Sequence, residues 1–320
     1  MKILVTGGAG YIGSHVVLEL CDSGYDVLVF DDLSLGFREN VDKRAELYVG
    51  STLKQSDLDT VLSQNIDAVI HLAAWKVAGE SMQNPEKYSQ NNIVGTLNIL
   101  NSLSKYNIEI FVLSSTAAVY GYPEYLPIDE NHSLHPINYY GYTKLVIEEN
   151  LKWFSNLQGI NYACLRYFNA AGYDINGRIR GKEKNPQNLL PIVMEIASGL
   201  RDEMYVFGND YETHDGTGIR DYVHVTDLAN AHVAALSYLN QENENIIVNL
   251  ATGNGYSVLD VIKSAEQVTQ KKINYKITNR RDGDLAELTS VSIQAKEKLH
   301  WEPKNSELNT ILSSMWNIYK

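Results

Sequence analysis

The first 170 residues alternate between short apolar runs and stretches with helical periodicity. Apolar runs typical of buried strands lie at residues 2–6, 26–30, 47–49, 67–71, 110–113 and 162–166. Between them, apolar positions recur three and four residues apart, which predicts helices after residue 11 and at about 54–64, 85–104 and 140–157. This alternation predicts an α/β fold with a doubly wound, parallel sheet of the Rossmann type.

The pattern becomes irregular after residue 170. Residues 174–220 are rich in Gly, Asn and Asp and contain one clear apolar helix at 189–197. A strand pattern returns at 246–250, and Ser257 and Asp260 have the spacing of a helix cap. Because no low-complexity linker separates the two parts, we expect a first domain over 1–173 and a smaller C-terminal α/β substrate lobe over 174–320. Residues from about 221 to 255 are expected to return to the first domain.

Composition and charge narrow the possible partners. The chain has 320 residues and a net charge of -12, which argues against a nucleic-acid partner because phosphate backbones require clustered Lys and Arg. A nucleotide held in a local cationic pocket stays possible. Two cysteines in apolar segments predict buried thiols in a reducing compartment. The chain has neither a signal-peptide pattern nor an apolar run of membrane-spanning length, so we expect a cytoplasmic protein without a membrane partner.

A glycine-rich turn separates the first expected strand from the first expected helix. Gly7, Gly10 and Gly13 lack β-carbons, so backbone amides can approach a pyrophosphate whose charge lies at the helix N-terminus. Asp31 ends the second strand, where a carboxylate can accept hydrogen bonds from ribose hydroxyls and repel a 2′-phosphate. The sequence therefore predicts NAD in preference to NADP. The alternatives are a purely structural turn and a solvated Asp31–Asp32 turn.

Tyr140 and Lys144 are four residues apart on an expected helix and therefore share one face. A phenol with a pKa near 10 can act as a base when a nearby ammonium and a nicotinium charge lower that pKa. Thr116 follows the strand at 110–113, and such strand ends border the ligand crevice. We expect its hydroxyl to bind the substrate oxygen beside Tyr140, although a turn-forming role is the alternative. These three residues predict redox chemistry at an alcohol or a sugar.

Further motifs extend this pattern along the chain. They are His71-Leu-Ala-Ala-Trp-Lys76, Asn91-Asn92, Leu165-Arg-Tyr-Phe168-Asn169, Phe207-Gly-Asn-Asp-Tyr211, Asp215-Gly-Thr-Gly-Ile-Arg220 and Arg280-Arg281. With them the chain resembles the extended short-chain dehydrogenase/reductase family over nearly its whole length, and within it the branch of UDP-sugar 4-epimerases. The resemblance implies that UDP-galactose and UDP-glucose are interconverted at C4 through a 4-keto intermediate, with tightly bound NAD.

The resemblance also implies two sets of binding residues. The NAD set is Gly7, Gly10, Tyr11, Ile12, Gly13, Asp31, Ser51, Thr52, Leu72, Ala73, Lys76, Asn91, Tyr140, Lys144 and Phe168. The UDP-sugar set is Thr116, Asn169, Asn188, Leu189, Phe207, Arg220, Arg281, Asp284 and Leu288. Arg220 and Arg281 suit a diphosphate and Phe207 can stack on uracil, whereas the alternative makes both arginines surface ion pairs.

The chain departs from the family pattern at two of these positions. Ser51 stands where the family often has an acid that contacts the adenine amine, so we expect Thr52 or the backbone to make that contact. Leu288 aligns with the position that limits sugar size, which is often tyrosine or cysteine. Because leucine is smaller than tyrosine, we expect room for N-acetylated sugars. The resemblance further implies a homodimer formed by the helices at 85–104 and 140–157.

Competing functions would require other residues. A 4,6-dehydratase should carry an Asp-Glu pair where Thr116 and Ala117 stand. A regulator that binds NAD without turnover should have lost Tyr140 or Lys144. A decarboxylase or uronate epimerase would need a cation for the C6 carboxylate and stays open, as does a UDP-N-acetylglucosamine epimerase. The eight histidines are scattered, and the one close pair, His132 and His135, lies in a loop with a proline and without an obvious third ligand, so no metal is expected.

Overall fold

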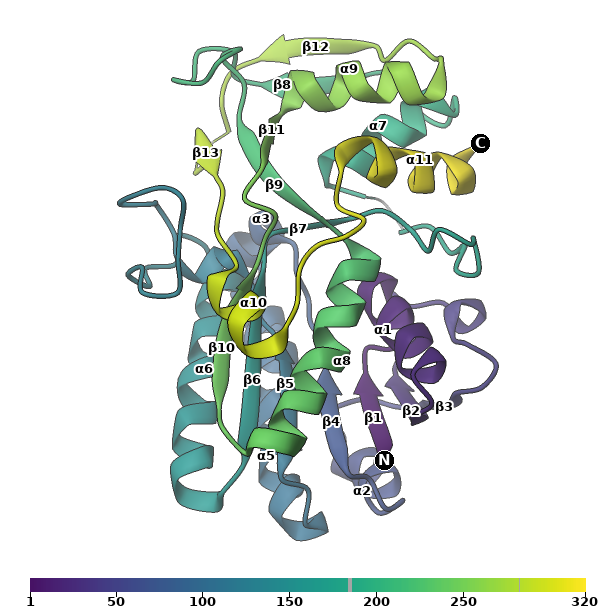
Figure 1. Cartoon of the computed structure of the whole chain (residues 1–320), viewed down its shortest axis with the longest axis vertical. Coiled ribbons are helices and arrows are strands. Elements are labelled where there is room, and N and C mark those ends of the chain that lie inside the picture. Colours follow the sequence, from purple (N-terminus) through teal and green to yellow (C-terminus); the bar gives the residue numbers. More distant parts are fainter. Residues whose placement is uncertain (184–185, 282) are drawn as a thin grey trace.

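The computed structural model describes residues 1–183, 186–281 and 283–320 (Figure 1). Within these residues, the main sheet has seven parallel strands in the order β10-β6-β5-β4-β1-β2-β3. The strands are β1 Lys2–Thr6, β2 Asp26–Asp31, β3 Glu46–Val49, β4 Ala68–His71, β5 Ile110–Ser114, β6 Asn161–Tyr167 and β10 Ile246–Leu250. The predicted doubly wound, parallel α/β fold is confirmed. The strand order reverses between β1 and β4, so ligands are expected at the carboxyl ends of these two strands.

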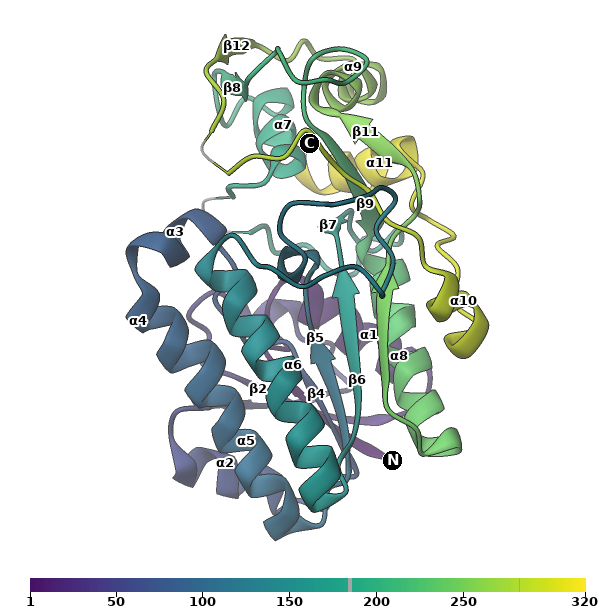
Figure 2. The ribbon, with the colours of Figure 1, turned by 90° about the vertical axis from the view of Figure 1, so that its left-hand side faces the viewer.

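Helices cover both faces of this sheet (Figures 1 and 2). They are α1 Tyr11–Asp22 and α8 Val225–Glu242 on one face, and α2 Gln55–Leu62, α5 Gly95–Leu103 and α6 Tyr139–Gln158 on the other. Side chains of β1 alternate between the two layers: Ile3 and Val5 pack with α1 and α8, and Leu4 packs with α2, α5 and α6. Burial on both faces explains why the strands have nearly continuous apolar sequences.

The helix predicted over 85–104 is not one continuous α-helix, so that prediction is wrong in detail. The structure has α4 Pro85–Tyr88, the π-helical turn η2 Ser89–Val94, α5 and the 3₁₀ turn η3 Ser104–Tyr106. Asn92 lies in the π-helical turn, where its amide accepts from Trp75 N at 2.9 Å and donates to Trp75 O at 3.0 Å. A π-helical turn carries no distinct apolar period and is therefore invisible to periodicity.

A second group of elements packs beyond the carboxyl ends of the main sheet (Figure 1). Its strands form a β11-β9-β13 sheet with β7 beside β9, and a β8-β12 pair. The elements are β7 Asn169–Ala171, α7 Leu189–Ala197, β8 Met204–Phe207, β9 Ile219–His224, β11 Gly255–Ser257, α9 Val258–Thr269, β12 Tyr275–Thr278, β13 Glu287–Leu288 and α11 Leu308–Tyr319. The helix α10 Ile293–Leu299 instead packs beside α8 and strand β10 of the main sheet. The predicted helix at 189–197 and the Ser257–Asp260 cap of α9 are confirmed.

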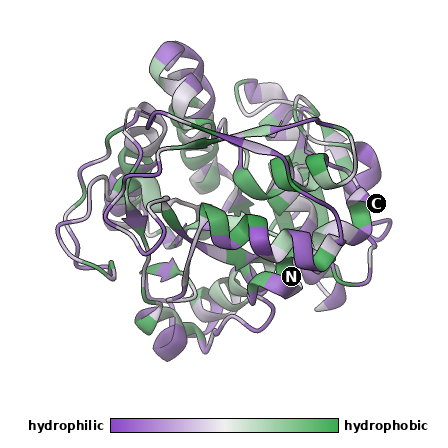
Figure 3. Cartoon of the chain, turned by 90° about the horizontal axis from the view of Figure 1, so that it is seen from above, coloured by the Kyte–Doolittle hydropathy of each residue, from purple (hydrophilic) through white to green (hydrophobic). Residues whose placement is uncertain are grey.

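The apolar core of this second group joins α7, α9 and α11. Val193, Val261 and Ile311 contribute one buried side chain from each helix. Viewed from above, hydrophobic segments gather toward the middle of the molecule and the peripheral loops are mostly hydrophilic (Figure 3). No described helix combines the length and the apolar character that a membrane span requires.

Candidate active site

The glycine turn joins β1, α1 and the chain after β4 in a close contact that excludes side chains. Gly7 has φ +72° and Gly10 is the N-cap of α1. A β-carbon on Gly13 would lie 2.1 Å from the carbonyl oxygen of Gly7, and one on Gly7 would lie 2.6 Å from Ala73 N. Because neither contact is tolerable, the turn requires glycine at both positions. The packing leaves the N-terminus of α1 as a site for a negatively charged group.

Asp31 supports this turn from the end of β2. Its carboxylate accepts from Ala9 N at 3.0 Å and from Leu33 N at 2.8 Å, and the residue is 8% exposed. Burial raises the pKa of Asp31, while the two backbone donors lower it. A carboxylate has about four lone-pair sites, so two remain for further donors. The bond to Ala9 was not predicted, because the sequence alone does not show which backbone amide meets a carboxylate.

Other predicted cofactor residues follow the carboxyl ends of β3 and β4. Ser51 N donates to Asp57 Oδ2 at 3.2 Å, and Leu72 N donates to Thr6 O at 3.0 Å. Thr52 lies against the start of α5, with its hydroxyl oxygen 2.5 Å from where a β-carbon of Gly95 would stand. These segments therefore border the same end of the sheet as the glycine turn.

Residues 172–183, which we call the crossing segment, contact the glycine turn and the chain after β4. Tyr11 donates its hydroxyl to Gly172 O at 2.5 Å. The ammonium of Lys76 pairs with Glu183 at 2.7 Å and lies 6.0 Å from the ring centroid of Tyr11. Glu183 was not predicted, since nothing in its local sequence distinguishes it from a surface acid.

Tyr140 and Lys144 begin α6, as predicted. Asn138 caps the helix by accepting from Gly141 N at 2.8 Å, and Ser81 Oγ accepts from Tyr140 N at 3.0 Å. Lys144 is 1% exposed, and its ammonium donates to Ser114 O at the end of β5 at 2.7 Å. Burial lowers the pKa of Lys144 to about 8. Hydrogen bonds at the start of α6 and at the ammonium of Lys144 thus hold both functional side chains on one face of the helix.

The structure brings the hydroxyl of Thr116 beside the phenol of Tyr140, within hydrogen-bonding reach. Burial raises the pKa of Tyr140 to about 12, and the Thr116 hydroxyl lowers it by a smaller amount. The sequence predicts that the ammonium of Lys144 lowers the pKa of Tyr140, but among the protein groups it does not do so. The physical reason is that burial dominates at Tyr140, while the Lys144 ammonium is hydrogen-bonded to Ser114 O.

The predicted anion-binding residues gather on the second group of elements. The guanidinium carbon of Arg281 lies 3.7 Å from the ring centroid of Phe207 at the end of β8. Arg220 on β9 forms an ion pair with Asp284 at 3.3 Å, and Asp284 N donates to Arg281 O at 3.2 Å. Two guanidinium groups, an aromatic ring and an acid are thus brought into one neighbourhood from three segments.

Leu288 and Phe168 connect this neighbourhood with the loop that carries Thr116. Leu288 packs against a buried cluster that includes Phe168 and Ala117, and its β13 register partner is Arg220. Asn169 donates its side-chain amide to the carbonyl oxygen of Asp221 at 3.0 Å. The remaining predicted residues occupy defined positions: Asn188 is the exposed N-cap of α7, Leu189 begins α7, Ile12 lies in α1, and Asn91 donates to Lys87 O at 3.1 Å.

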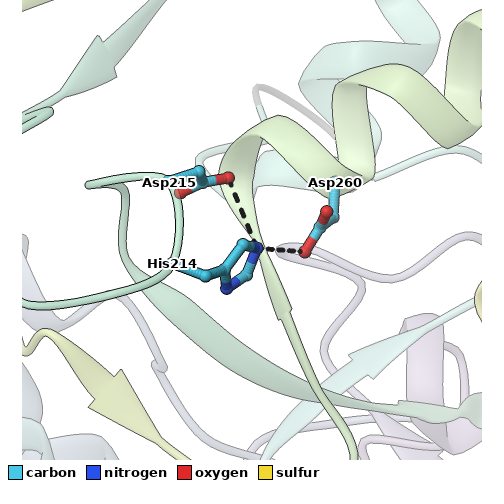
Figure 4. A group of neighbouring side chains, drawn as sticks. All are labelled: His214, Asp215 and Asp260. Atoms are coloured by element: carbon cyan, nitrogen blue, oxygen red, sulfur yellow. Dashed lines mark ion pairs between the residues drawn. The ribbon is translucent and has the colours of Figure 1, made fainter.

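A separate group of titratable side chains lies at the start of α9 (Figure 4). His214 Nε2 is 3.1 Å from an Asp260 oxygen and 3.7 Å from an Asp215 oxygen. Both carboxylates also accept hydrogen bonds from the backbone. Asp260 completes the capping box of α9 with Ser257, and Asp215 accepts from Thr217 N at 2.8 Å. The arrangement ties the loop at His214 to the N-terminus of α9.

Comparisons with known proteins point to one enzyme family. The model of the NAD dependent epimerase/dehydratase family matches residues 3–251. A UDP-glucose 4-epimerase of Halalkalibacterium halodurans is 45% identical, over 100% of this chain and 96% of that protein. A UDP-glucose 4-epimerase from Brucella ovis, solved in complex with NAD, is 40% identical with a TM-score of 0.96, covering 99% of this chain and 98% of that one. The Bifidobacterium longum UDP-glucose 4-epimerase, solved with NAD+ and UDP, is 36% identical with a TM-score of 0.94, covering 99% and 98%.

Proposed function

The chain belongs to the NAD dependent epimerase/dehydratase family, and from that premise we propose that it is a UDP-glucose 4-epimerase, which interconverts UDP-galactose and UDP-glucose. One observation carries the proposal. Tyr140 and Lys144 share the inner face of α6, and the Thr116 hydroxyl bonds the phenol at the carboxyl end of the sheet. The alternative is another UDP-sugar enzyme, such as a UDP-N-acetylglucosamine or UDP-uronate 4-epimerase. It is not favoured, because the relatives that match over the full length are UDP-glucose 4-epimerases.

The cofactor is NAD, which supplies a reversible hydride acceptor when bound. The close packing of Gly7 and Gly13 fits a pyrophosphate at the start of α1, and Asp31 retains acceptor sites for ribose hydroxyls. We propose that the further NAD contacts come from the remaining residues of the predicted set. These are Gly10, Tyr11, Ile12, Ser51, Thr52, Leu72, Ala73, Lys76, Asn91, Tyr140, Lys144 and Phe168.

In the proposed reaction, Tyr140 removes the proton of the sugar 4-hydroxyl as C4 is oxidised, and returns it after the 4-keto sugar has presented its other face. The buried phenol has a raised pKa, so the phenolate requires positive charge nearby. The nicotinium charge of bound NAD would be the main source, because Lys144 does not lower this pKa among the protein groups. Thr116 holds the same sugar oxygen through its hydroxyl and keeps the phenol oriented.

Inversion requires that the UDP part be held firmly while the hexose turns. Arg220 and Arg281 can bind a diphosphate with paired donors, and Phe207 offers a ring for uracil. We propose that Asn169, Asn188, Leu189 and Asp284 complete this set and that Leu288 borders the sugar. Residues 1–173 would then carry NAD, while 174–320 mainly carry the UDP-sugar, with about 221–255 returning to the first domain.

We also propose a cytoplasmic homodimer that pairs the helices of 85–104 and 140–157 across a two-fold axis. Figure 2 shows α4, α5 and α6 side by side on one outer face. Apolar side chains are exposed on this face: Tyr142 by 48%, Trp153 by 65% and Leu157 by 74%. Several large exposed apolar side chains on neighbouring turns are typical of an interaction surface, and two-fold dimers are the commonest oligomers.

Incubation of the purified protein with UDP-galactose and no added NAD tests the function. The proposal predicts formation of UDP-glucose, because the cofactor stays bound through the cycle. A parallel incubation with UDP-glucuronate tests the alternative. With protein that contains NAD, the proposal fails if UDP-galactose is left unchanged or if only UDP-glucuronate is converted.

A further inference from the structure

Three successive residues of the chain leaving β5 contact three residues of α6 that are four positions apart. The pairs are Ser114 O with Lys144 Nζ at 2.7 Å, Ser115 Oγ with Glu148 Oε1 at 2.5 Å, and Thr116 with Tyr140. Residues four apart lie on one helix face, so a short loop beside that face can meet all three, although the order of the contacts differs from the order along the helix. The outer two pairs involve the proposed base and its lysine, and the middle pair involves Glu148, which has no role in the proposed reaction.

Glu148 is fixed from behind by a buried arginine on β6. Arg166 donates from Nε to Oε1 at 3.0 Å and from its terminal nitrogen to Oε2 at 2.5 Å. The side chains of Arg166 and Glu148 are 3% and 0% exposed. Arg166 also donates to the hydroxyl of Tyr120 at 3.1 Å. Such a two-point, buried ion pair leaves the carboxylate one orientation, in which it accepts from Ser115.

We propose that Glu148 is a positioning residue of the reaction: it anchors Ser115 and thereby holds Ser114 against Lys144 and Thr116 against Tyr140. This inference rests on the proposed function, because it assigns Glu148 a role only if Tyr140 and Lys144 perform the chemistry. A shift of Ser115 would move both neighbouring contacts at once. Displacements of about 1 Å can slow a reaction on the order of 100-fold. The Ser115 side-chain bond therefore acts on both functional side chains, together with the bond from Ser115 N to Leu165 O at 2.9 Å that ties the same residue to β6.

The charge of Glu148 acts on Lys144 as well. Its carboxylate raises the pKa of Lys144 against the lowering effect of burial. The other titratable groups facing Lys144 from the packed strands are His71 on β4, whose pKa burial lowers to about 3, and Cys164 on β6, whose pKa burial raises. Both are therefore neutral at pH 7. The carboxylate of Glu148 thus favours the charged form of Lys144 near neutral pH.

Two substitutions separate the anchoring effect from the charge effect. Ser115→Ala removes the hydrogen bond and keeps the carboxylate, whereas Glu148→Gln removes the charge and keeps an acceptor oxygen. For Ser115→Ala we expect kcat for UDP-galactose to fall about 10-fold with KM unchanged and the alkaline limb of the pH profile in place. For Glu148→Gln we expect a similar fall, with the alkaline limb moved about one unit toward lower pH. Glu149→Gln is the matched control, because Glu149 is exposed and pairs with Lys152 on the outer face of the same helix.

A second readout does not depend on turnover. The phenol of Tyr140 is titrated by ultraviolet difference absorbance, with Tyr140→Phe in the same background as the blank. We expect the Tyr140 pKa to rise in Ser115→Ala, since the Thr116 contact that lowers it is loosened. Inactive wild-type protein would contradict the proposed function, whereas this titration would still report on the anchor.

The inference is overturned if Ser115→Ala keeps the kcat and the Tyr140 pKa of the wild type. It is also overturned if Glu148→Gln folds and its pH profile coincides with that of Glu149→Gln. Because Glu148→Gln leaves the Arg166 charge buried without its partner, the double variant Glu148→Gln, Arg166→Gln is measured beside it. If folding recovers in the double variant but kcat does not, the anchoring role is supported; recovery of both shows that Glu148 serves stability alone.

Discussion

The ammonium of Lys144 donates a 2.7 Å hydrogen bond to the carbonyl oxygen of Ser114 while the residue is only 1% exposed. A buried ammonium is destabilising unless it is fully compensated, and here burial lowers the pKa of Lys144 from 10.5 to about 8. Lys144 therefore reduces the stability of the fold at the position where we propose that it serves the reaction. This conflict has a measurable dependence on pH.

Lys144→Met is expected to stabilise the fold at pH 7 by about 2 kcal/mol, because each unit of pKa shift corresponds to about 1.4 kcal/mol and one carbonyl bond is lost. The pKa of Lys144 is lower in the folded than in the unfolded chain. The penalty is therefore complete below pH 8 and disappears as the pH rises toward about 10.4. Unfolding measured at pH 7 and pH 10 should show the difference between variant and wild type narrowing. A difference of the same size at both values, or one matched by the exposed Lys152→Met, would contradict the assignment.

Tyr140→Phe should reduce turnover of UDP-galactose about 100- to 10,000-fold, since it removes the proposed proton acceptor. The affinity for UDP should be retained, because the proposed UDP contacts lie on other segments. Calorimetric titration with UDP and a turnover assay measure the two effects separately. Tyr142→Phe serves as the control on an exposed position of the same helix. Near-normal turnover by Tyr140→Phe would refute the role.

Gly13→Ala should yield protein without NAD, because the new methyl group would stand 2.1 Å from the carbonyl oxygen of Gly7. Release of nucleotide after denaturation in alcohol measures the occupancy directly. Gly79→Ala is the matched control, since a β-carbon there meets no atom within 4 Å. Full NAD occupancy in Gly13→Ala would show that the turn does not hold the pyrophosphate.

Leu288→Tyr should lower turnover of UDP-N-acetylglucosamine more than turnover of UDP-glucose. The side chain packs beside Phe168 and Ala117, so a larger ring would reduce the space next to the proposed sugar position. The two substrates are compared by kcat/KM in wild type and variant. If the wild type has no detectable activity on UDP-N-acetylglucosamine, the proposed room for N-acetylated sugars is rejected.

Leu157→Glu should convert the proposed dimer into a monomer, because it places a charge on the exposed apolar face of α6. Light scattering coupled to size-exclusion chromatography gives the mass. Leu200→Glu is an equivalent change outside the proposed interface, at a leucine that is 66% exposed. A monomeric wild type, or a dimer that tolerates Leu157→Glu, would exclude this interface.

The main sheet could be predicted because its strands are covered on both faces. Each strand is therefore a short apolar run whose first and last residues are easy to recognise in the sequence. The short strands of the second group were not predicted. The strand β12, for example, alternates apolar and polar residues over Tyr275–Thr278, but it has only four residues and all of them are exposed, so the pattern does not mark a half-buried strand. Its pairing with β8 is a long-range contact that no local pattern reports.

The site could be predicted where chemistry has a fixed spacing and not where it depends on distant partners. Tyr140 and Lys144 are recognisable as a pair because four residues make one helical turn. The acceptor of Lys144 is a backbone carbonyl, which any residue supplies. The direction of the Tyr140 pKa shift depends on how completely the fold buries the phenol, which spacing does not reveal.

The π-helical turn at Ser89–Val94 determines what a deletion between α4 and α5 would do to the structure. A π-helical turn holds one extra residue within a single wide turn, so deleting that residue would let the segment wind as an ordinary α-helix while α5 keeps its orientation. The wide turn is what presents Asn92 to the backbone of Trp75, so these two hydrogen bonds would be lost while the buried side chains of α5 stay in place. We therefore expect a single deletion within Ser89–Val94 to loosen the chain at Trp75 and to leave the packing of α5 intact.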